Sequence, residues 1–196
     1  MNNALFKNRY YNDTDFKNCG FKNVGKNVKI HENVNIYGIK NIVIGDNVRI
    51  DPYVSIIASG SIIIGSYVHI GSYSLLIGAE GITLENFTGL SQGVKIYTRS
   101  DDYSGNYLTN PTVPKKYLGL KKGPVLLKKH VIVGANTVIL PGVIIGEGSS
   151  VGALSLVTKS IPGWYICAGI PAKKIKTRSK KILKLEKELL KLNISE

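Results

Sequence analysis

Two adjacent aspartates, Asp101 and Asp102, are the side chains of this sequence best suited to chemistry. A carboxyl group that is shielded from water, or that lies beside a second carboxylate, has a raised pKa and can act as a general base. Tyr103, Asn106 and Tyr107 follow, and they could contact a polar ligand or pack the loop. The run Asp-Asp-Tyr-Ser-Gly is equally typical of a turn in which an aspartate accepts hydrogen bonds from backbone amides. Both roles remain open from the sequence.

Three histidines are alternative bases, because imidazole titrates near neutral pH. His130 follows the aspartates along the chain and is the best placed, whereas His69 and His31 lie nearer the N-terminus. The three occupy different positions of the six-residue repeat described below, so they do not stack into a metal-binding row, and we expect no metal. Cys19 and Cys167 lie far apart in the sequence, which favours two reduced thiols over a disulfide.

The aspartates stand near the start of a long segment, residues 98–122, that lacks any repeat. Loops of this length inside a compact domain are usually functional or disordered. This one is rich in tyrosine, which argues against disorder. We therefore expect a protruding, ordered loop that carries part of a site.

On both sides of this loop, a branched aliphatic residue recurs every six residues. The spacing of equivalent hexads is 20 residues before the loop, as in Val24, Ile44 and Ile64, and 18 residues after it, as in Leu127 and Ile145. One hexad buries too little to be stable alone, whereas stacked turns bury a continuous core. The pattern predicts an all-β, triangular solenoid with three short strands per turn. The two extra residues of each early turn fall at one corner, at positions 37–43, 57–63 and 77–83.

The two ends of the chain lack the hexad. We expect residues 1–21 to cap the open N-terminal end of the solenoid, because an uncapped coil exposes a sheet edge. The solenoid itself is expected over residues 22–175. Residues 176–196 predict a C-terminal α-helix with Ile182, Leu185 and Leu189 on its apolar face. This basic helix could pack on the solenoid end or a neighbouring subunit, or touch a membrane surface.

The C-terminal coils resemble the hexapeptide-repeat acyltransferases, whose fold is a left-handed parallel β-helix. The resemblance rests on Ile132-Val-Gly-Ala-Asn-Thr-Val, on Val151-Gly-Ala-Leu-Ser and on Ala168-Gly-Ile-Pro-Ala-Lys. It covers roughly residues 22–175 and is strongest to the sugar O-acetyltransferase branch, which includes galactoside, maltose, O-antigen and capsule acetyltransferases. The left-handed twist is implied by this resemblance and not by the repeat.

The resemblance implies an acetyl-coenzyme A site in a cleft between two subunits of a homotrimer. Small residues on successive coils would let the pantetheine arm approach, and the turn near the C-terminus would meet the adenosine. The cofactor residues implied in this way are Gly134, Ala135, Gly152, Ala153, Pro171, Ala172 and Lys173. The long loop would reach across a subunit boundary. The family also places an asparagine on the hexad before the loop, where this chain has Gln92 and Gly93. Gln92 is the candidate acceptor contact there, beside Tyr103, Asn106 and Tyr107 of the loop, which could equally pack the loop.

One departure from the family pattern concerns the base. The family places a histidine just after a Tyr-Thr stretch, where this chain has Tyr97-Thr98 followed by Arg-Ser and then Asp101. We predict acetyl transfer from acetyl-coenzyme A to a hydroxyl of a sugar or nucleotide sugar in surface polysaccharide biosynthesis, with Asp101, Asp102 or His130 as the base. The alternatives are an N-acetyltransferase of a nucleotide-linked amino sugar, which needs less help from a base, a xenobiotic acetyltransferase, and a non-catalytic scaffold.

The chain is strongly basic, with a formal net charge of +13. The lysines form several clusters and not one stripe, and no nucleic-acid-binding motif is present, so nucleic acid is not the expected partner. Some lysines could receive phosphates of coenzyme A or of a nucleotide-linked or lipid-linked acceptor. The sequence has no apolar run of membrane-spanning length and no secretory leader, so we expect a cytoplasmic protein.

Overall fold

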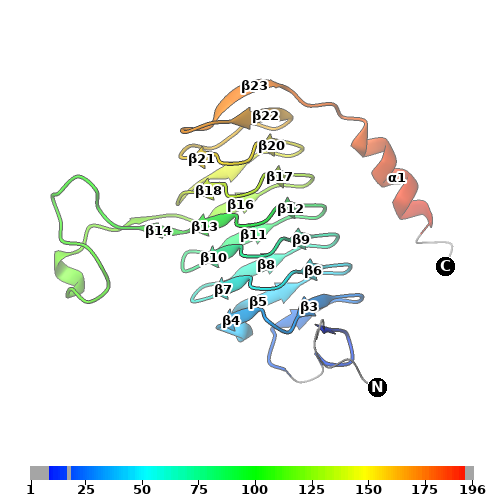
Figure 1. Ribbon diagram of the computed structural model, residues 1–196, viewed down its shortest axis with the longest axis horizontal. Coiled ribbons are helices and arrows are strands. Elements are labelled where there is room, and N and C mark those ends of the chain that lie inside the picture. Colours follow the sequence, from blue (N-terminus) through cyan, green and yellow to red (C-terminus); the bar gives the residue numbers. More distant parts are fainter. Residues whose placement is uncertain (1–8, 17–18, 193–196) are drawn as a thin grey trace, which may run out of the picture.

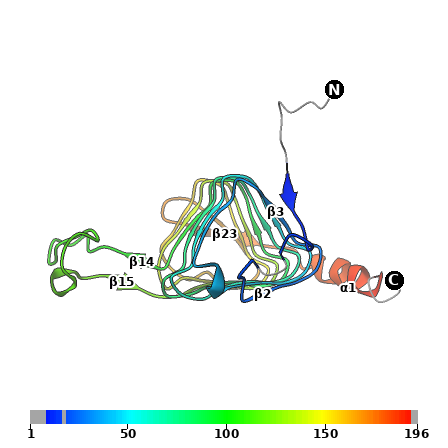
Figure 2. The same cartoon turned by 90° about the horizontal axis from the view of Figure 1, so that it is seen from below.

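The computed structural model describes residues 9–16 and 19–192, and expectations for residues 1–8, 17–18 and 193–196 lie outside this part of the chain. It confirms the predicted fold, a left-handed parallel β-helix of triangular cross-section (Figures 1 and 2). Short strands stack in register, turn upon turn, into three sheets. A loop projects from one side of the solenoid, and a helix lies against the opposite side.

The first sheet holds nine of the described strands. In spatial order they are β1 (Tyr10–Tyr11), β3 (Lys29–His31), β6 (Arg49–Ile50), β9 (His69–Ile70), β12 (Gly89–Leu90), β17 (Ile132–Val133), β20 (Ser150–Val151), β22 (Tyr165–Ala168) and β23 (Lys173–Thr177). All neighbours are parallel except at the two ends, where β1 pairs antiparallel with β3 and β23 pairs antiparallel with β22.

The other two sheets hold six described strands each and are parallel throughout. The second sheet contains β4 (Asn35–Tyr37), β7 (Ser55–Ile57), β10 (Leu75–Ile77), β13 (Lys95–Tyr97), β18 (Val138–Ile139) and β21 (Leu156–Val157). The third contains β2 (Asn23–Val24), β5 (Ile42–Ile44), β8 (Ile62–Ile64), β11 (Ile82–Leu84), β16 (Val125–Leu127) and β19 (Ile144–Ile145). The remaining elements are the 3-10 turns η1 (Ile39–Asn41) and η2 (Lys115–Tyr117), strands β14 (Arg99–Ser100) and β15 (Lys121–Lys122), and helix α1 (Ile182–Leu192).

The core consists of aliphatic ladders that run the length of the solenoid. In the first sheet the pairing places Ile50, Ile70, Leu90 and Val133 above one another, and each side chain is fully buried. In-register parallel pairing forces like positions to stack, so a branched side chain every sixth residue builds a continuous apolar column. Each coil depends on its neighbours for both its core contacts and its backbone hydrogen bonds.

Three corners join the sheets, and we number them in chain order. The first corner leads from the third sheet to the first, for example at residues 85–88. The second leads from the first sheet to the second, at residues 51–54, 71–74, 91–94, 134–137 and 152–155. The third leads from the second sheet to the third, and it contains the extra residues 38–41, 58–61 and 78–81 of the early turns as well as the long loop. The predicted bulging at one corner is therefore confirmed.

The N-terminal segment closes the first coil through backbone and side-chain contacts. The Asp13 carboxylate accepts hydrogen bonds from the amides of Asn27 (2.8 Å) and Val28 (3.0 Å), which hold the pKa of Asp13 below its usual range. On the neighbouring face, Tyr10 of β1 donates its hydroxyl hydrogen to Asp51 at 3.0 Å. These contacts cover strand edges that the first coil would otherwise leave unpaired.

The C-terminal tail folds back along the first corner. Residues 173–177 form β23, so the helix begins later than expected, at Ile182. The Arg178 guanidinium donates to the carbonyl oxygens of His130 (2.9 Å) and Gly148 (3.0 Å). No helix among the residues described is both long and apolar enough to cross a membrane.

Glu186 of α1 attaches the helix to the solenoid. Its carboxylate bonds His130 at 2.8 Å and pairs with Lys129, and the side chains of His130 and Glu186 are almost fully buried. Glu186→Ala leaves His130 buried without this partner, so we expect the helix to lose about 1–3 kcal/mol of stability toward local opening. Amide hydrogen exchange in α1 would measure this. Glu188→Ala is the control, because Glu188 is exposed and its ion pair with Lys184 is long, at 3.9 Å. Its effect on stability should stay below about 0.5 kcal/mol.

The same contact should make the helix attachment sensitive to acid. Burial raises the pKa of Glu186, but hydrogen bonds and charges from Lys129 and His130 outweigh burial and hold the pKa below its usual value of 4.5. A carboxyl group with a depressed pKa in the folded state stabilises that state above its unfolded pKa and loses the effect as pH falls through the folded value. Protection of α1 should therefore decline below about pH 4.5, and a pH-independent helix would contradict this assignment.

Candidate active site

The long loop leaves the third corner on a two-stranded stalk. Strands β14 and β15 pair antiparallel, with Arg99 opposite Lys122 and Ser100 opposite Lys121, and the loop tip stands well clear of the solenoid (Figures 1 and 2). At its base, Arg99 donates to the Glu80 carboxylate at 2.6 Å. The stalk thus fixes the position of the two aspartates that follow β14.

Asp102 has a structural role in this loop. Its carboxylate accepts hydrogen bonds from the Ser104 hydroxyl (2.8 Å) and from the amides of Ser104 (3.2 Å), Asn106 (3.0 Å) and Tyr107 (3.3 Å). These bonds, the Ser104 hydroxyl first, hold the pKa of Asp102 below its usual range. The expectation of a raised pKa is therefore wrong for Asp102, because the turn stabilises the ionised form.

The three expected acceptor contacts in the loop differ in exposure. The Asn106 side-chain amide donates to the Ser104 hydroxyl at 2.8 Å, and the ring of Tyr107 packs against Gly119, where an added Cβ would collide with it. Both residues therefore shape the loop. Tyr103 is 93% exposed, and Tyr107, which also lines the pocket inside the loop, is 55% exposed, so both rings are open to a ligand or a partner chain.

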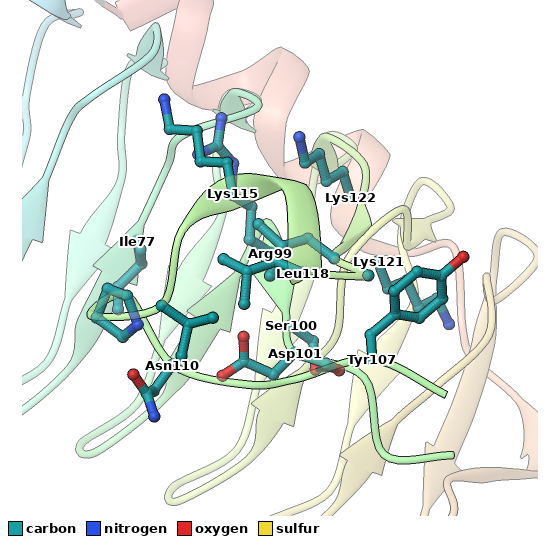
Figure 3. Close-up of a pocket in the computed structure, with 14 residues that line it drawn as sticks. Ile77, Arg99, Ser100, Asp101, Tyr107, Asn110, Lys115, Leu118, Lys121 and Lys122 are labelled. Atoms are coloured by element: carbon teal, nitrogen blue, oxygen red, sulfur yellow. Dashed lines mark hydrogen bonds between the residues drawn. The ribbon is translucent and has the colours of Figure 1, made fainter. Parts of the chain in front are cut away.

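Asp101 is placed differently from Asp102. Asp101 lines a cleft of about 890 Å³ at the junction of the loop and the second sheet, together with Asp102, Tyr97 and Val138. It also borders a pocket of about 1120 Å³ inside the loop, shown in Figure 3. None of the described residues donates a hydrogen bond to its carboxylate. Asp101 is thus a partly buried carboxylate with free acceptor positions that faces open space.

The surroundings of Asp101 are strongly basic. Arg99, Lys115, Lys121 and Lys122 line the pocket inside the loop, and Figure 3 shows Lys115 and Lys122 at the end away from the Asp101 carboxylate. Such a cluster suits an anionic ligand such as a phosphate or diphosphate.

The residues expected to hold the cofactor gather at the second corner. Gly134 and Ala135 form one turn of this corner, and Gly152 and Ala153 form the next. A Cβ added at Gly134 would collide with the backbone of Ala153, so close packing of the coils alone already requires glycine there. The same glycines leave backbone exposed, which fits a long flexible ligand that lies along the corner.

The C-terminal end of this corner is completed by the turn that precedes β23. The amide of Ala172 donates to the Leu156 carbonyl at 2.8 Å, and the peptide bond between Ile170 and Pro171 is cis. Lys173 follows as the first residue of β23 and is exposed, whereas the ammonium of Lys174 lies 3.6 Å from the centre of the Tyr165 ring. Of the two lysines, Lys173 is thus the one whose ammonium contacts no side chain among the described residues.

Within one chain the two parts of the site are separated. Gln92 belongs to the second corner, Asp101 lies beyond the third, and strand β13 of the second sheet runs between them. The structure thus brings Gln92 together with the cofactor residues, and Asp101 together with the loop residues. A site that uses both parts requires the loop of one chain to reach the second corner of another.

His130 belongs to neither part. It lies at the first corner with its ring stacked on Phe87 at 5.0 Å, and α1 covers it through Glu186. His69 is paired with Asp51 at 2.8 Å on the outer face of the first sheet, also away from the loop. Among the described residues, no group of histidine, cysteine and carboxylate side chains is arranged to hold a metal ion.

Comparisons with known proteins agree with this geometry. Residues 124–159 match the family model described as bacterial transferase hexapeptide (six repeats). The chain is 44% identical over 178 residues to a dTDP-4-amino-4,6-dideoxy-D-glucose acyltransferase of Escherichia coli, an alignment that covers 90% of this chain and 93% of that protein.

Two solved structures are similarly close. One is AntD, an N-acyltransferase from Bacillus cereus, in complex with dTDP and 3-hydroxybutyryl-CoA; it is 47% identical with a TM-score of 0.91, and the match covers 94% of this chain and 98% of AntD. The other is a variant of AntD in which a serine is replaced by cysteine, in complex with dTDP-4-amino-4,6-dideoxyglucose and coenzyme A. It is 45% identical with a TM-score of 0.91, and the match covers 95% of this chain and 99% of that one. A similarity that spans nearly the whole chain, together with the stacked six-residue repeats, shows that the protein belongs to the hexapeptide-repeat acyltransferases.

Proposed function

We propose that the protein transfers an acyl group from an acyl-coenzyme A to the amino group of a nucleotide-linked 4-amino sugar. The observation that carries this proposal is the near full-length similarity to acyltransferases whose names and bound ligands specify a dTDP-linked amino sugar and coenzyme A. It favours the amine alternative over the hydroxyl acceptor expected first. The missing loop histidine, which was difficult to reconcile with O-acetylation, is consistent with an amine acceptor.

The chemistry assigned to Asp101 is proton transfer. The neutral amine nitrogen bonds to the acyl carbon while the carbon–sulfur bond breaks, and one proton must move from nitrogen to the departing thiolate. A carboxylate with free acceptor positions can hold that proton between the two atoms. Asp102 is unsuited to this task, because its oxygens are occupied by the loop's own amides and its ionised form is stabilised.

We further propose that the site forms between chains of a homotrimer. The second corner of one chain supplies the coenzyme A track, including Gly134, Ala135, Gly152 and Ala153. The loop of a neighbouring chain supplies Asp101 and its basic surroundings. This arrangement would bring together the two parts that lie apart in one chain. It would also let the exposed ring of Tyr103 pack against the neighbouring chain. Sedimentation that shows only monomers at micromolar concentrations would contradict the proposal.

A thiol-release assay tests the reaction. With dTDP-4-amino-4,6-dideoxyglucose as acceptor, we expect release of coenzyme A and a product that resists hydroxylamine, because amides survive conditions that cleave esters. The matched dTDP-6-deoxyglucose, with a hydroxyl in place of the amine, should give little turnover. Acetyl-coenzyme A and 3-hydroxybutyryl-coenzyme A should be compared as donors. Equal turnover of both acceptors, or an ester product, would contradict this proposal and favour the O-acetylation hypothesis.

Coenzyme A binding provides a separate prediction. Because Lys173 is exposed beside the turn that ends the second corner, Lys173→Ala should remove one phosphate contact and weaken coenzyme A binding by roughly tenfold, the scale of one charge-assisted hydrogen bond. Titration calorimetry would measure this. Lys174→Ala is the control, since the Lys174 ammonium already lies over Tyr165, and it should bind coenzyme A nearly as well as the wild type.

A further inference from the structure

Two stacked tyrosines form an unusual exposed feature of the second corner. The rings of Tyr53 and Tyr73 lie 5.1 Å apart at an interplanar angle of 15°, and they occupy equivalent positions on successive coils. Their exposed fractions are 51% and 65%. Both residues have left-handed backbone conformations, with φ of 63° and 62°, which are strained for aromatic residues. Positive φ recurs at the corners of other coils, for example at Asn47 and Phe87, so it belongs to the corner geometry; the exposure of the two rings is what requires an explanation.

The first corner shows what such aromatics do when they serve packing. Tyr67 and Phe87 also stack, at 4.6 Å, and also have positive φ, but their column continues into His130 under α1. The rings of Tyr67 and Phe87 are therefore partly covered by the protein itself. Over Tyr53 and Tyr73 the described residues provide no comparable cover.

The coil after Tyr73 leaves a gap in this column. The next residue in register is Gly93, whose amide donates to the carbonyl of Ser72 at 2.8 Å, and the one after is Asn136, whose amide donates to Gln92. Gly93 has no side chain, so no ring continues the stack beyond Tyr73, which is 65% exposed; the Asn136 side-chain amide lies where a Cβ of Gly93 would be. Coils repeat about every 4.8 Å, so a flat ring can stack on Tyr73 below Asn136.

Two polar groups border this gap. The Asn136 side chain reaches down to the place where a Cβ of Gly93 would be, and no described residue hydrogen-bonds its amide group. The Lys95 ammonium donates to the Gly93 carbonyl at 3.2 Å, which places a positive charge at the corner. A flat aromatic face, an amide with free donors and acceptors, and a cation are together the groups that recognise a nucleoside diphosphate.

We propose that the base of the nucleotide-linked acceptor stacks on Tyr73 in the space beside Gly93, with Asn136 at the edge of the base and Lys95 near the diphosphate. This inference rests on the proposed function, because it assumes a nucleotide-linked acceptor. The inference also assigns the two ligands to different coils of the second corner. The nucleotide lies at the coils of Tyr73 and Gly93, and coenzyme A lies at the following coils, at Gly134 and Ala153.

Binding of dTDP, without any acyl donor, tests the inference separately from catalysis. Stacking of a base on an aromatic side chain contributes about 1–3 kcal/mol, so Tyr73→Ala should weaken dTDP binding in calorimetry by about 5- to 150-fold. Tyr73→Phe keeps the ring and should bind like the wild type. Tyr37→Ala is the matched control, because Tyr37 is 64% exposed on β4 at the third corner. The NMR signals of the thymine protons should shift upfield with wild type and Tyr73→Phe, but not with Tyr73→Ala.

Thymidine and dTDP together separate the two contacts. Tyr73→Ala should weaken binding of both, whereas Lys95→Gln should weaken dTDP and leave thymidine unchanged. If dTDP binds the wild type and Tyr73→Ala equally well, the stacking inference fails and the proposed function stands. If dTDP does not bind the wild type, both fail. If Tyr73→Ala instead breaks the assembly in sedimentation, the tyrosines are a subunit contact and the inference is overturned.

Discussion

Replacing Asp101 by asparagine should lower turnover by about 10²- to 10⁴-fold, the usual scale for removing a general base. Asparagine preserves the shape of the side chain but cannot accept and return a proton. Because Asp101 makes no side-chain hydrogen bond to a described residue, the loop should keep its structure and the Kd for coenzyme A should remain close to that of the wild type. Steady-state rates of thiol release, with titration calorimetry for the cofactor, would measure both effects.

The neighbouring aspartate provides the control for this prediction. Asp102→Asn retains one acceptor oxygen for the loop amides but loses the charge that Ser104, Asn106 and Tyr107 stabilise. We expect a less ordered loop, a higher KM for the acceptor and a much smaller loss of kcat than for Asp101→Asn. Full activity of Asp101→Asn together with an inactive His130→Ala would move the base to His130, which would require α1 to leave the solenoid.

The solenoid could be predicted from the sequence because its period is rigid. Every sixth residue must face the core, and a coil that slipped by one residue would expose its aliphatic ladder. The same regularity located the loop, since residues 98–122 interrupt a register that resumes at Val125. The position of Asp101 at the base of this loop also follows from the chain itself.

The parts that could not be predicted depend on contacts between distant segments. The sequence did not reveal that Glu186, 56 residues after His130, covers that histidine. Nor did it show which of the two adjacent aspartates would accept hydrogen bonds from the loop amides. That depends on the direction in which each side chain leaves the backbone, which the sequence does not determine. The stacked tyrosines had a detectable signal: Tyr53 and Tyr73 stand 20 residues apart, one coil period, and Gly93 follows at the same interval.

Mixing two inactive variants should restore activity if the site lies between chains. Asp101→Asn removes the proposed base from the loop, and Ala153→Trp places a large ring on the exposed second corner, where it should block coenzyme A. Ser59→Trp, at an exposed position of the third corner, is the control for a bulky substitution that leaves the cofactor track open. Asp101→Asn and Ala153→Trp should each have at least about 10²-fold less activity than the wild type when tested alone, whereas Ser59→Trp should remain active.

In trimers assembled from equal amounts of the two variants, a site is intact when its loop comes from an Ala153→Trp chain and its corner from an Asp101→Asn chain. In a trimer that contains both variants, one of the three junctions between chains meets both conditions, so about one third of the sites in doubly tagged trimers should be active. Co-expression with two affinity tags, followed by thiol-release assays on doubly tagged protein, would measure this recovery. A site contained within one chain could not recover, because no chain in the mixture carries both Asp101 and Ala153.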